Sequence, residues 1–258
     1  MLNSPEFIRT LEKLAYDLWP PEHEEAIGEW RLRASQGITK RANSVFTLNQ
    51  IPDDPNWFTK VSEFYQQHQL PVHYHVSDAS PSELKEILAS QGFYEHTDCT
   101  VMVADTEEVQ LYAGQRITND ANDIRIILTP QVDESWIQDF LRISEYDPCK
   151  FHFYAHMLER IKGPQCFIKL QKNTQIIGIG TAVSQHGWTG LLNIAIDPEF
   201  RGQALSYYIL HALAEWASEQ NSPNMFLQVV TDNIPAVKLY QNSSFKPLYQ
   251  YHYWSQQS

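Results

Sequence analysis

Residues 191–217 decide the fold, and they read LLNIAIDPEFRGQALSYYILHALAEWA. The apolar run at 191–196 is typical of a buried strand, residues 197–204 form a polar turn, and apolar residues then recur at helical spacing as far as Glu219. A tight loop that leads into a helix presents free backbone N–H groups and the positive end of the helix dipole, which together suit a pyrophosphate. Many α/β proteins use such a loop only to reverse the chain, so both hypotheses stay open for this stretch alone.

A second motif follows at residues 231–245, which read TDNIPAVKLYQNSSF. Taken singly, Asn233 is an ordinary helix N-cap and Tyr240 an ordinary half-buried aromatic residue. Because two helical turns separate them, their side chains lie near the same helix face. The spacing therefore predicts that both side chains can address one ligand.

The remaining periodicity predicts helices and strands in alternation. In the first half, helices are expected at 7–19, 55–69 and 81–90, a hairpin between 30 and 46, and strands at 71–76 and 94–104. In the second half, further strands are expected at 124–128, 166–170, 176–184, 225–230 and 247–254, and helices at 133–144, 151–161 and 234–243. Residues 105–122 have weak periodicity and are the expected linker. We therefore predict an α/β fold with a mixed sheet and two domains, 1–117 and 123–258.

Composition supports two compact domains and argues against nucleic-acid binding. The chain has 258 residues, 43% hydrophobic and 12% aromatic, which suffices for buried cores. Its formal charge is −12, and no run of Lys and Arg forms a patch for phosphates, so we expect no nucleic-acid partner. The charge favours a cationic or neutral substrate, although a solvated acidic surface that keeps the protein soluble is the simpler explanation of it.

Cysteine usage and the N-terminus indicate the compartment. Three cysteines without a CxxC spacing suit a reducing environment, and they suggest neither a metal site nor a thiol nucleophile. Charged residues interrupt the first apolar segment, so we expect no signal peptide. No run approaches the ~20 apolar residues of a membrane span. We expect a cytoplasmic protein that does not associate with membranes.

On the two motifs at 191–217 and 229–245, the chain resembles the GCN5-related N-acetyltransferases, the GNAT superfamily. The resemblance runs in order and spacing over residues 124–258. It implies a mostly antiparallel, twisted sheet flanked by helices, and acetyl-CoA as cosubstrate. It also implies direct acetyl transfer to a primary amine of a small molecule or a protein terminus, with no metal and no covalent enzyme intermediate.

The resemblance assigns roles to particular residues. Backbone groups of Ile194, Ala195 and Ile196 would bind the pantetheine arm, and Asn233 would contact the cofactor. Tyr240 would act as the general acid that protonates the departing thiolate, which suits a phenol because its proton stays on at neutral pH. The pyrophosphate would be held, mainly through main-chain N–H groups, by Arg201, Gly202, Gln203, Ala204, Leu205, Ser206 and Tyr207.

Some positions depart from the family pattern. Ala204 and Ser206 stand where glycine is usual, and so does Ser244 before Phe245; a β-carbon at Ala204 implies crowding or a costlier backbone conformation. Gln228 replaces the glutamate that serves some relatives as general base, and an amide cannot accept a proton at neutral pH. His152, His156 and His186 could replace it as the base by acting through a water molecule, but each is more readily explained as a surface or structural residue.

The first half resembles a degenerate GNAT domain, as in tandem GNAT proteins, in the stretch WRLRASQGITKRANSV and the pair Gly92-Phe93. Its loop at 46–59 has no glycine-rich turn and carries two aspartates, so we expect no cofactor there. This domain either shapes an acceptor pocket or only packs. The leading hypothesis is an N-acetyltransferase, the alternatives are a non-catalytic acyl-CoA sensor or scaffold and a pseudoenzyme that binds no CoA, and the oligomeric state is open.

Overall fold

The computed structural model describes residues 4–117 and 123–256, which form two compact units. Unit 1 comprises Met1–Val101, Val230–Asp232 and Leu248–Ser258, and unit 2 comprises Met102–Val229 and Asn233–Pro247. These limits differ from the domains 1–117 and 123–258 expected from the sequence. Residues 102–117 belong with the second unit, and most of the last strand belongs with the first.

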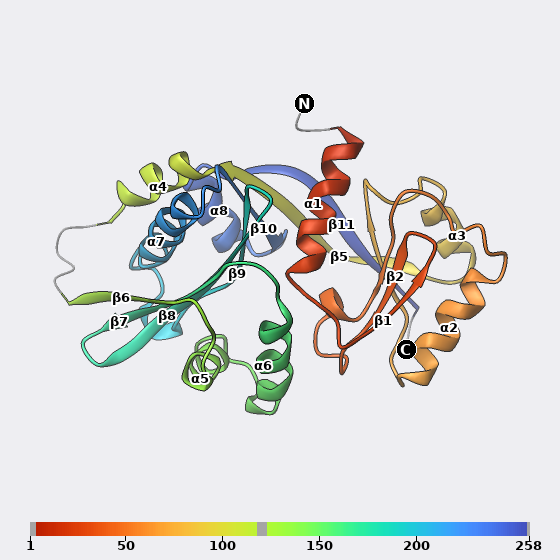
Figure 1. The fold of residues 1–258 in the computed structure, drawn as a ribbon, viewed down its shortest axis with the longest axis horizontal. Helices are drawn as coiled ribbons and strands as arrows, with labels where there is room; N and C mark the ends of the chain where they lie inside the picture. Colours follow the sequence, from red (N-terminus) through yellow and green to blue (C-terminus); the bar gives the residue numbers. More distant parts are fainter. Residues whose placement is uncertain (1–3, 118–122, 257–258) are drawn as a thin grey trace. The chain divides into compact units, whose positions relative to one another are not determined.

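Unit 2 is a sheet with helices on both faces (Figure 1). Its strands follow the order β5-β10-β9-β8-β7-β6, of which β5 (Tyr94–Asp105) belongs to this unit from Met102 onward. Strands β6 to β9 pair antiparallel, and β10 pairs parallel with β9. This confirms the predicted mixed, mostly antiparallel sheet. Its strands are β6 (Ile124–Thr129), β7 (Gln165–Lys172), β8 (Gln175–Gln185), β9 (Trp188–Ile196) and β10 (Asn224–Val230), and its α-helices are α4 (Thr106–Gly114), α5 (Glu134–Ile143), α6 (Phe151–Arg160), α7 (Ser206–Glu219) and α8 (Ile234–Asn242); short 3-10 turns are η2 (Pro148–Lys150) and η3 (Pro198–Phe200).

Helix α7 packs closely on the sheet because β8 carries two glycines beneath it. A β-carbon on Gly180 would lie 2.8 Å from Cγ2 of Ile209 and 2.9 Å from Cγ2 of Ile168. Ile209 and Leu213 are fully buried in the core of this unit. The small residues therefore set how near the helix, and the loop before it, can come to the sheet.

Unit 1 contains α1 (Pro5–Asp17) and a sheet in the order β1-β2-β3-β4-β11-β5. Strands β3 and β4 pair parallel, whereas β1 with β2, β2 with β3, and β4 with β11 pair antiparallel. One face packs on α2 and α3 in an aromatic core. The remaining elements are β1 (His23–Ile27), β2 (Trp30–Ala34), η1 (Lys40–Ala42), β3 (Val45–Phe46), α2 (Trp57–Gln67), β4 (His73–Ser77), α3 (Leu84–Ser90), β5 (Tyr94–Asp105) and β11 (Lys246–Ser255).

One expectation about local structure was wrong, and one strand was not expected. Residues 106–114 form helix α4 instead of linker, because the Asp105 side chain caps the N–H groups of Glu107 and Glu108 and because Val109 and Ala113 are buried. The rest of the expected linker, 118–122, lies outside the described residues. The expected hairpin exists as β2 with β3, but β1 also pairs with β2 through a tight turn at Gly28.

Candidate functional site

A β-bulge in β9 marks the candidate site. The register between β8 and β9 passes from Ile179 opposite Ala195 to Thr181 opposite Leu192, so two residues of β9 face one of β8. Asn193, within the bulge, has a left-handed φ of 57°. A bulge bends its strand and redirects the residues that follow, here residues 194–196.

Strands β9 and β10 then separate. Their parallel pairing runs from Trp188 opposite Asn224 to Leu191 opposite Leu227 and ends there, although both strands continue. Backbone groups of β9 beyond Leu191 therefore face an opening on the side of β10. Such groups need a hydrogen-bond partner, and an extended chain bound in the opening supplies one.

The loop after β9 is held by ionic and hydrogen bonds beneath it. Asp197 accepts hydrogen bonds from the N–H of Glu199, at 3.2 Å, and from Nη1 of Arg142, at 2.6 Å. Nη2 of Arg142 also donates to the carbonyl of Ile176, at 2.7 Å. Nε of Arg201 donates to the carbonyl of Ile196, at 3.1 Å, so this side chain braces the loop.

Free N–H groups gather where the loop meets α7. Gly202 and Ala204 have left-handed φ values of 77° and 59°, and Leu205 at the helix N-cap position provides no side-chain cap. In the part of the chain that the structure describes, the N–H groups of residues 202–206 donate to no backbone acceptor. Clustered N–H groups at a helix N-terminus form an anion site.

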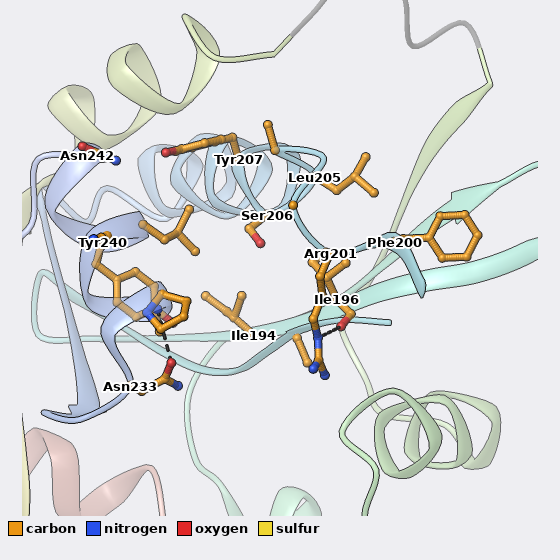
Figure 2. Close-up of a pocket in the computed structure, with 17 residues that line it drawn as sticks. Ile194, Ile196, Phe200, Arg201, Leu205, Ser206, Tyr207, Asn233, Tyr240 and Asn242 are labelled. Carbon is orange, nitrogen blue, oxygen red and sulfur yellow. Dashed lines mark hydrogen bonds between the residues drawn. The ribbon is translucent and has the colours of Figure 1, made fainter. Parts of the chain in front are cut away.

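Helix α8 supplies the opposite wall. Oδ1 of Asn233 accepts a hydrogen bond from the N–H of Ala236, at 3.3 Å, which makes it the helix N-cap. Tyr240 is 9% exposed, and its ring lies 5.9 Å from that of Phe245 in an edge-on contact. Figure 2 shows Tyr240 and Ile194 facing the same space from α8 and β9.

These features enclose one cavity of about 630 Å³. It brings together all but one of the predicted site residues: Ile194, Ala195, Ile196, Arg201, Gly202, Ala204, Leu205, Ser206, Tyr207, Asn233 and Tyr240. Gln203 does not line it, and its side chain is exposed on the loop. Sequence reasoning missed the further lining residues Phe200, Pro235, Ala236, Lys238, Leu239 and Asn242.

The departures from glycine differ in their consequences. Ser206 is the first residue of α7, so it needs no left-handed backbone. Ala204 and Ser244 do adopt one, with φ values of 59° and 72°. The hydroxyl group of Ser244 donates a hydrogen bond to Glu108 of α4, whereas Ala204 has no side-chain group that can make a hydrogen bond.

The residues considered as a general base, His152, His156 and His186, do not line the cavity. Gln228 is half-buried on β10, one residue beyond the end of its pairing with β9. The cavity therefore combines a cluster of free N–H groups, an open strand edge and a phenol, and its lining includes no carboxylate or imidazole.

Comparisons with known proteins agree with this geometry. Residues 6–254 match the family described as "Probable histone acetyltransferase Rv0428c C-terminal". The chain is 33% identical over 246 residues to "Uncharacterized N-acetyltransferase YobR" of Bacillus subtilis (strain 168), covering 95% of this chain and 97% of that protein.

Solved structures show the same fold at low identity. A GCN5-related N-acetyltransferase from Kribbella flavida has a TM-score of 0.70 at 9% identity, covering 96% of this chain and 95% of that one. A tandem GNAT protein from the clavulanic acid biosynthesis pathway has a TM-score of 0.67 at 11% identity, covering 95% and 86%. The chain therefore belongs to the family described as probable histone acetyltransferase Rv0428c C-terminal, it is an N-acetyltransferase, and its fold is that of the GNAT structures.

Proposed function

We propose that this enzyme transfers the acetyl group of acetyl-CoA to a primary amine by direct attack, with the cofactor bound in the cavity of unit 2. The observation that carries the proposal is the row of free N–H groups at 202–206, which opens into the same cavity as the free edge of β9. Membership in an N-acetyltransferase family favours this over the sensor and pseudoenzyme hypotheses.

Each part of acetyl-CoA finds complementary chemistry. The N–H groups of residues 202–206 and the positive end of α7 suit the pyrophosphate. The open edge of β9 at Ile194 to Ile196 suits the amide groups of the pantetheine arm, which pair as a strand would. The ammonium group of Lys238, at the cavity wall, adds a positive charge for the phosphates.

Tyr240 is the proposed general acid. The amine nitrogen forms a bond to the acetyl carbon while the carbon–sulfur bond breaks, and the phenol gives its proton to the departing thiolate. Holding the thioester and the amine in contact supplies much of the acceleration. The proton lost by the amine goes to solvent, because Gln228 carries an amide that cannot accept it.

The acceptor is then bound as the neutral amine. This predicts that kcat/KM rises with pH until it reaches the pKa of the amine in solution, and that the inflection moves when an amine of lower pKa is used. The family description names histones, so a screen should contain lysine-bearing tail peptides as well as small amines. The expected cytoplasmic location stays a prediction; within residues 4–117 and 123–256, no helix is long and apolar enough to cross a bilayer.

The test compares Tyr240→Phe with Tyr207→Phe, since both tyrosines line the cavity but only Tyr240 is the proposed acid. Release of free CoA thiol is followed with a panel of amines. Loss of a general acid lowers kcat by roughly 10²–10⁴-fold, and the Kd for acetyl-CoA should stay nearly constant in Tyr240→Phe. If Tyr240→Phe turns over every accepted amine at the rate of the parent enzyme, Tyr240 is not the acid.

A further inference from the structure

Arg116 carries a positive charge next to the cavity of unit 2, and no step of the proposed acetyl transfer uses it. This residue follows the end of α4 and is half-buried. Its guanidinium carbon lies 5.4 Å from the ring centre of Tyr207, and Tyr207 lines the cavity. A guanidinium over an aromatic face is held there by cation–π attraction. The charge of Arg116 is therefore fixed beside the cavity wall.

Tyr207 links this guanidinium to the cluster of free N–H groups. It is the second residue of α7, so it comes directly after residues 202–206. Figure 2 shows the Tyr207 ring extending from α7 toward the side where Asn242 lies, away from Phe200 and Arg201. The guanidinium of Arg116 therefore stands one tyrosine ring beyond the N–H groups.

Most donors of this guanidinium are free. Of the five N–H groups of an arginine, one on Nη1 donates to the carbonyl of Tyr112, at 3.2 Å. Among residues 4–117 and 123–256, Arg116 makes no other hydrogen bond and no ion pair. Glu107 and Glu108 lie in the first turn of α4, about 12 Å or more away along the helix axis. The charge of Arg116 is thus uncompensated within the described chain.

The two cations that line the cavity have other tasks. Arg201 is engaged, since its Nε donates to the carbonyl of Ile196, at 3.1 Å, and its Nη2 lies 3.4 Å from the carboxylate of Glu145. Lys238 is in the wall formed by α8, where its charge suits the pyrophosphate. Neither accounts for a further anionic group outside the N–H cluster.

Acetyl-CoA has such a group. Besides its pyrophosphate it carries a phosphate on the 3′ oxygen of its ribose, with nearly two negative charges at neutral pH. One sugar ring separates the two, so a residue that binds the 3′-phosphate must stand a short way beyond the pyrophosphate site. In a chain with a net charge of −12, binding this group needs a local positive charge. A guanidinium matches it well, because it can donate two parallel hydrogen bonds to phosphate oxygens.

We propose that Arg116 binds the 3′-phosphate of acetyl-CoA and so makes the enzyme select CoA thioesters over 3′-dephospho-CoA thioesters. The inference rests on the proposed function, because it takes acetyl-CoA to occupy the cavity of unit 2. Tyr207 has a positioning role in it, since its ring holds the guanidinium in place.

The test is titration calorimetry of the full-length protein with acetyl-CoA and, separately, with acetyl-3′-dephospho-CoA, at constant ionic strength. In the parent protein, Kd should be about tenfold or more lower for acetyl-CoA than for the dephospho compound. Arg116→Met should raise Kd for acetyl-CoA by that factor and leave Kd for the dephospho compound unchanged, so the ratio falls to about one. Arg116→Lys keeps the charge without the planar fork, so it should retain part of the ratio.

Two further variants separate this role from general effects of charge. Lys238→Met should raise both Kd values by the same factor, because both compounds carry the pyrophosphate. Arg125→Met removes an exposed arginine of β6 that does not line the cavity, and it should change neither value. A loss of packing alone would likewise raise both Kd values in Arg116→Met and keep their ratio.

The outcomes distinguish this inference from the proposed function. Equal Kd values for the two compounds in the parent protein would overturn the role of Arg116 while acetyl-CoA binding itself stands. The same holds for a ratio that survives in Arg116→Met or that disappears in Lys238→Met instead. Absence of binding of both compounds to the parent protein would overturn the proposed function and this inference with it.

Discussion

Replacing Ala204 by glycine should stabilise the protein, although glycine usually destabilises. Ala204 has a φ of 59°, and a left-handed backbone costs a residue with a β-carbon roughly 1–2 kcal/mol. Glycine removes that cost but makes the unfolded chain more flexible, which offsets roughly 0.4–1 kcal/mol. The net gain is about 0.5–1 kcal/mol, or about 1–4 °C in Tm for a chain of this size.

The assay is urea unfolding followed by far-UV circular dichroism, with Ala155→Gly as the matched control in the same unit. Ala155 lies inside helix α6, where glycine costs about 1 kcal/mol, so the two substitutions should shift stability in opposite directions. The N–H groups of the loop are unchanged in Ala204→Gly, so the affinity for acetyl-CoA should not fall. A loss of stability in Ala204→Gly equal to that in Ala155→Gly would refute the assignment of strain to this position.

Three further predictions test other parts of the structure. Gly180→Ala should cost about 1–3 kcal/mol of stability by overpacking, because its β-carbon meets the stiff Cγ2 methyl groups of Ile209 and Ile168. Gly178→Ala should cost less and be relieved by Ile196→Val, which removes the Cδ1 atom that lies 2.7 Å from the new β-carbon. Urea unfolding of the single and double variants measures both effects. Burial opposes ionisation of Glu12, but its pair with His75 holds the Glu12 pKa below the usual 4.5. The stability that this pair contributes is therefore complete above pH 4.5 and is lost as the pH falls through the folded-state pKa. Glu12→Gln should lower stability at pH 7 by up to roughly 3–5 kcal/mol, and it should flatten the acid limb when the free energy of unfolding is measured against pH. Arg142→Met removes the donor to Asp197, so the Kd for acetyl-CoA, measured by titration calorimetry, should increase. Arg125→Met is the control, because Arg125 is exposed on β6, and it should leave the Kd unchanged.

Local periodicity was sufficient to predict most helices and strands, and the failures have physical causes. Strand β1 has the sequence HEEAI, whose first four side chains are exposed, so no alternation of apolar residues marks it. Helix α4 was missed because its apolar residues are few, although Asp105 followed by Glu107 and Glu108 is a usable N-terminal signal. The assignment of residues 248–255 to unit 1 was beyond prediction, because alternation on β11 defines faces and not pairing partners.

For the candidate site too, the local sequence pattern predicts one part, and the folded path of the chain decides the rest. The loop motif and the Asn233 to Tyr240 spacing place backbone groups and helix positions, so they predicted most of the cavity lining. Side chains such as Phe200 and Lys238 enter the cavity only through the path of the loop and the rotation of α8. That path depends on Ala204 and Gly202 being left-handed, which the sequence indicates for glycine but not for alanine.

Binding of acetyl-CoA in the cavity of unit 2 is tested most directly by titration calorimetry of acetyl-CoA into the parent protein, Ala204→Trp and Gln203→Trp. Ala204 lines the cavity, whereas its exposed neighbour Gln203 does not, so an indole at 204 should block the site and one at 203 should leave it open. We expect micromolar binding in the parent protein and in Gln203→Trp, and none in Ala204→Trp with an unchanged circular dichroism spectrum. Absence of binding in the parent protein, or equal binding in all three proteins, would show that acetyl-CoA does not bind in this cavity.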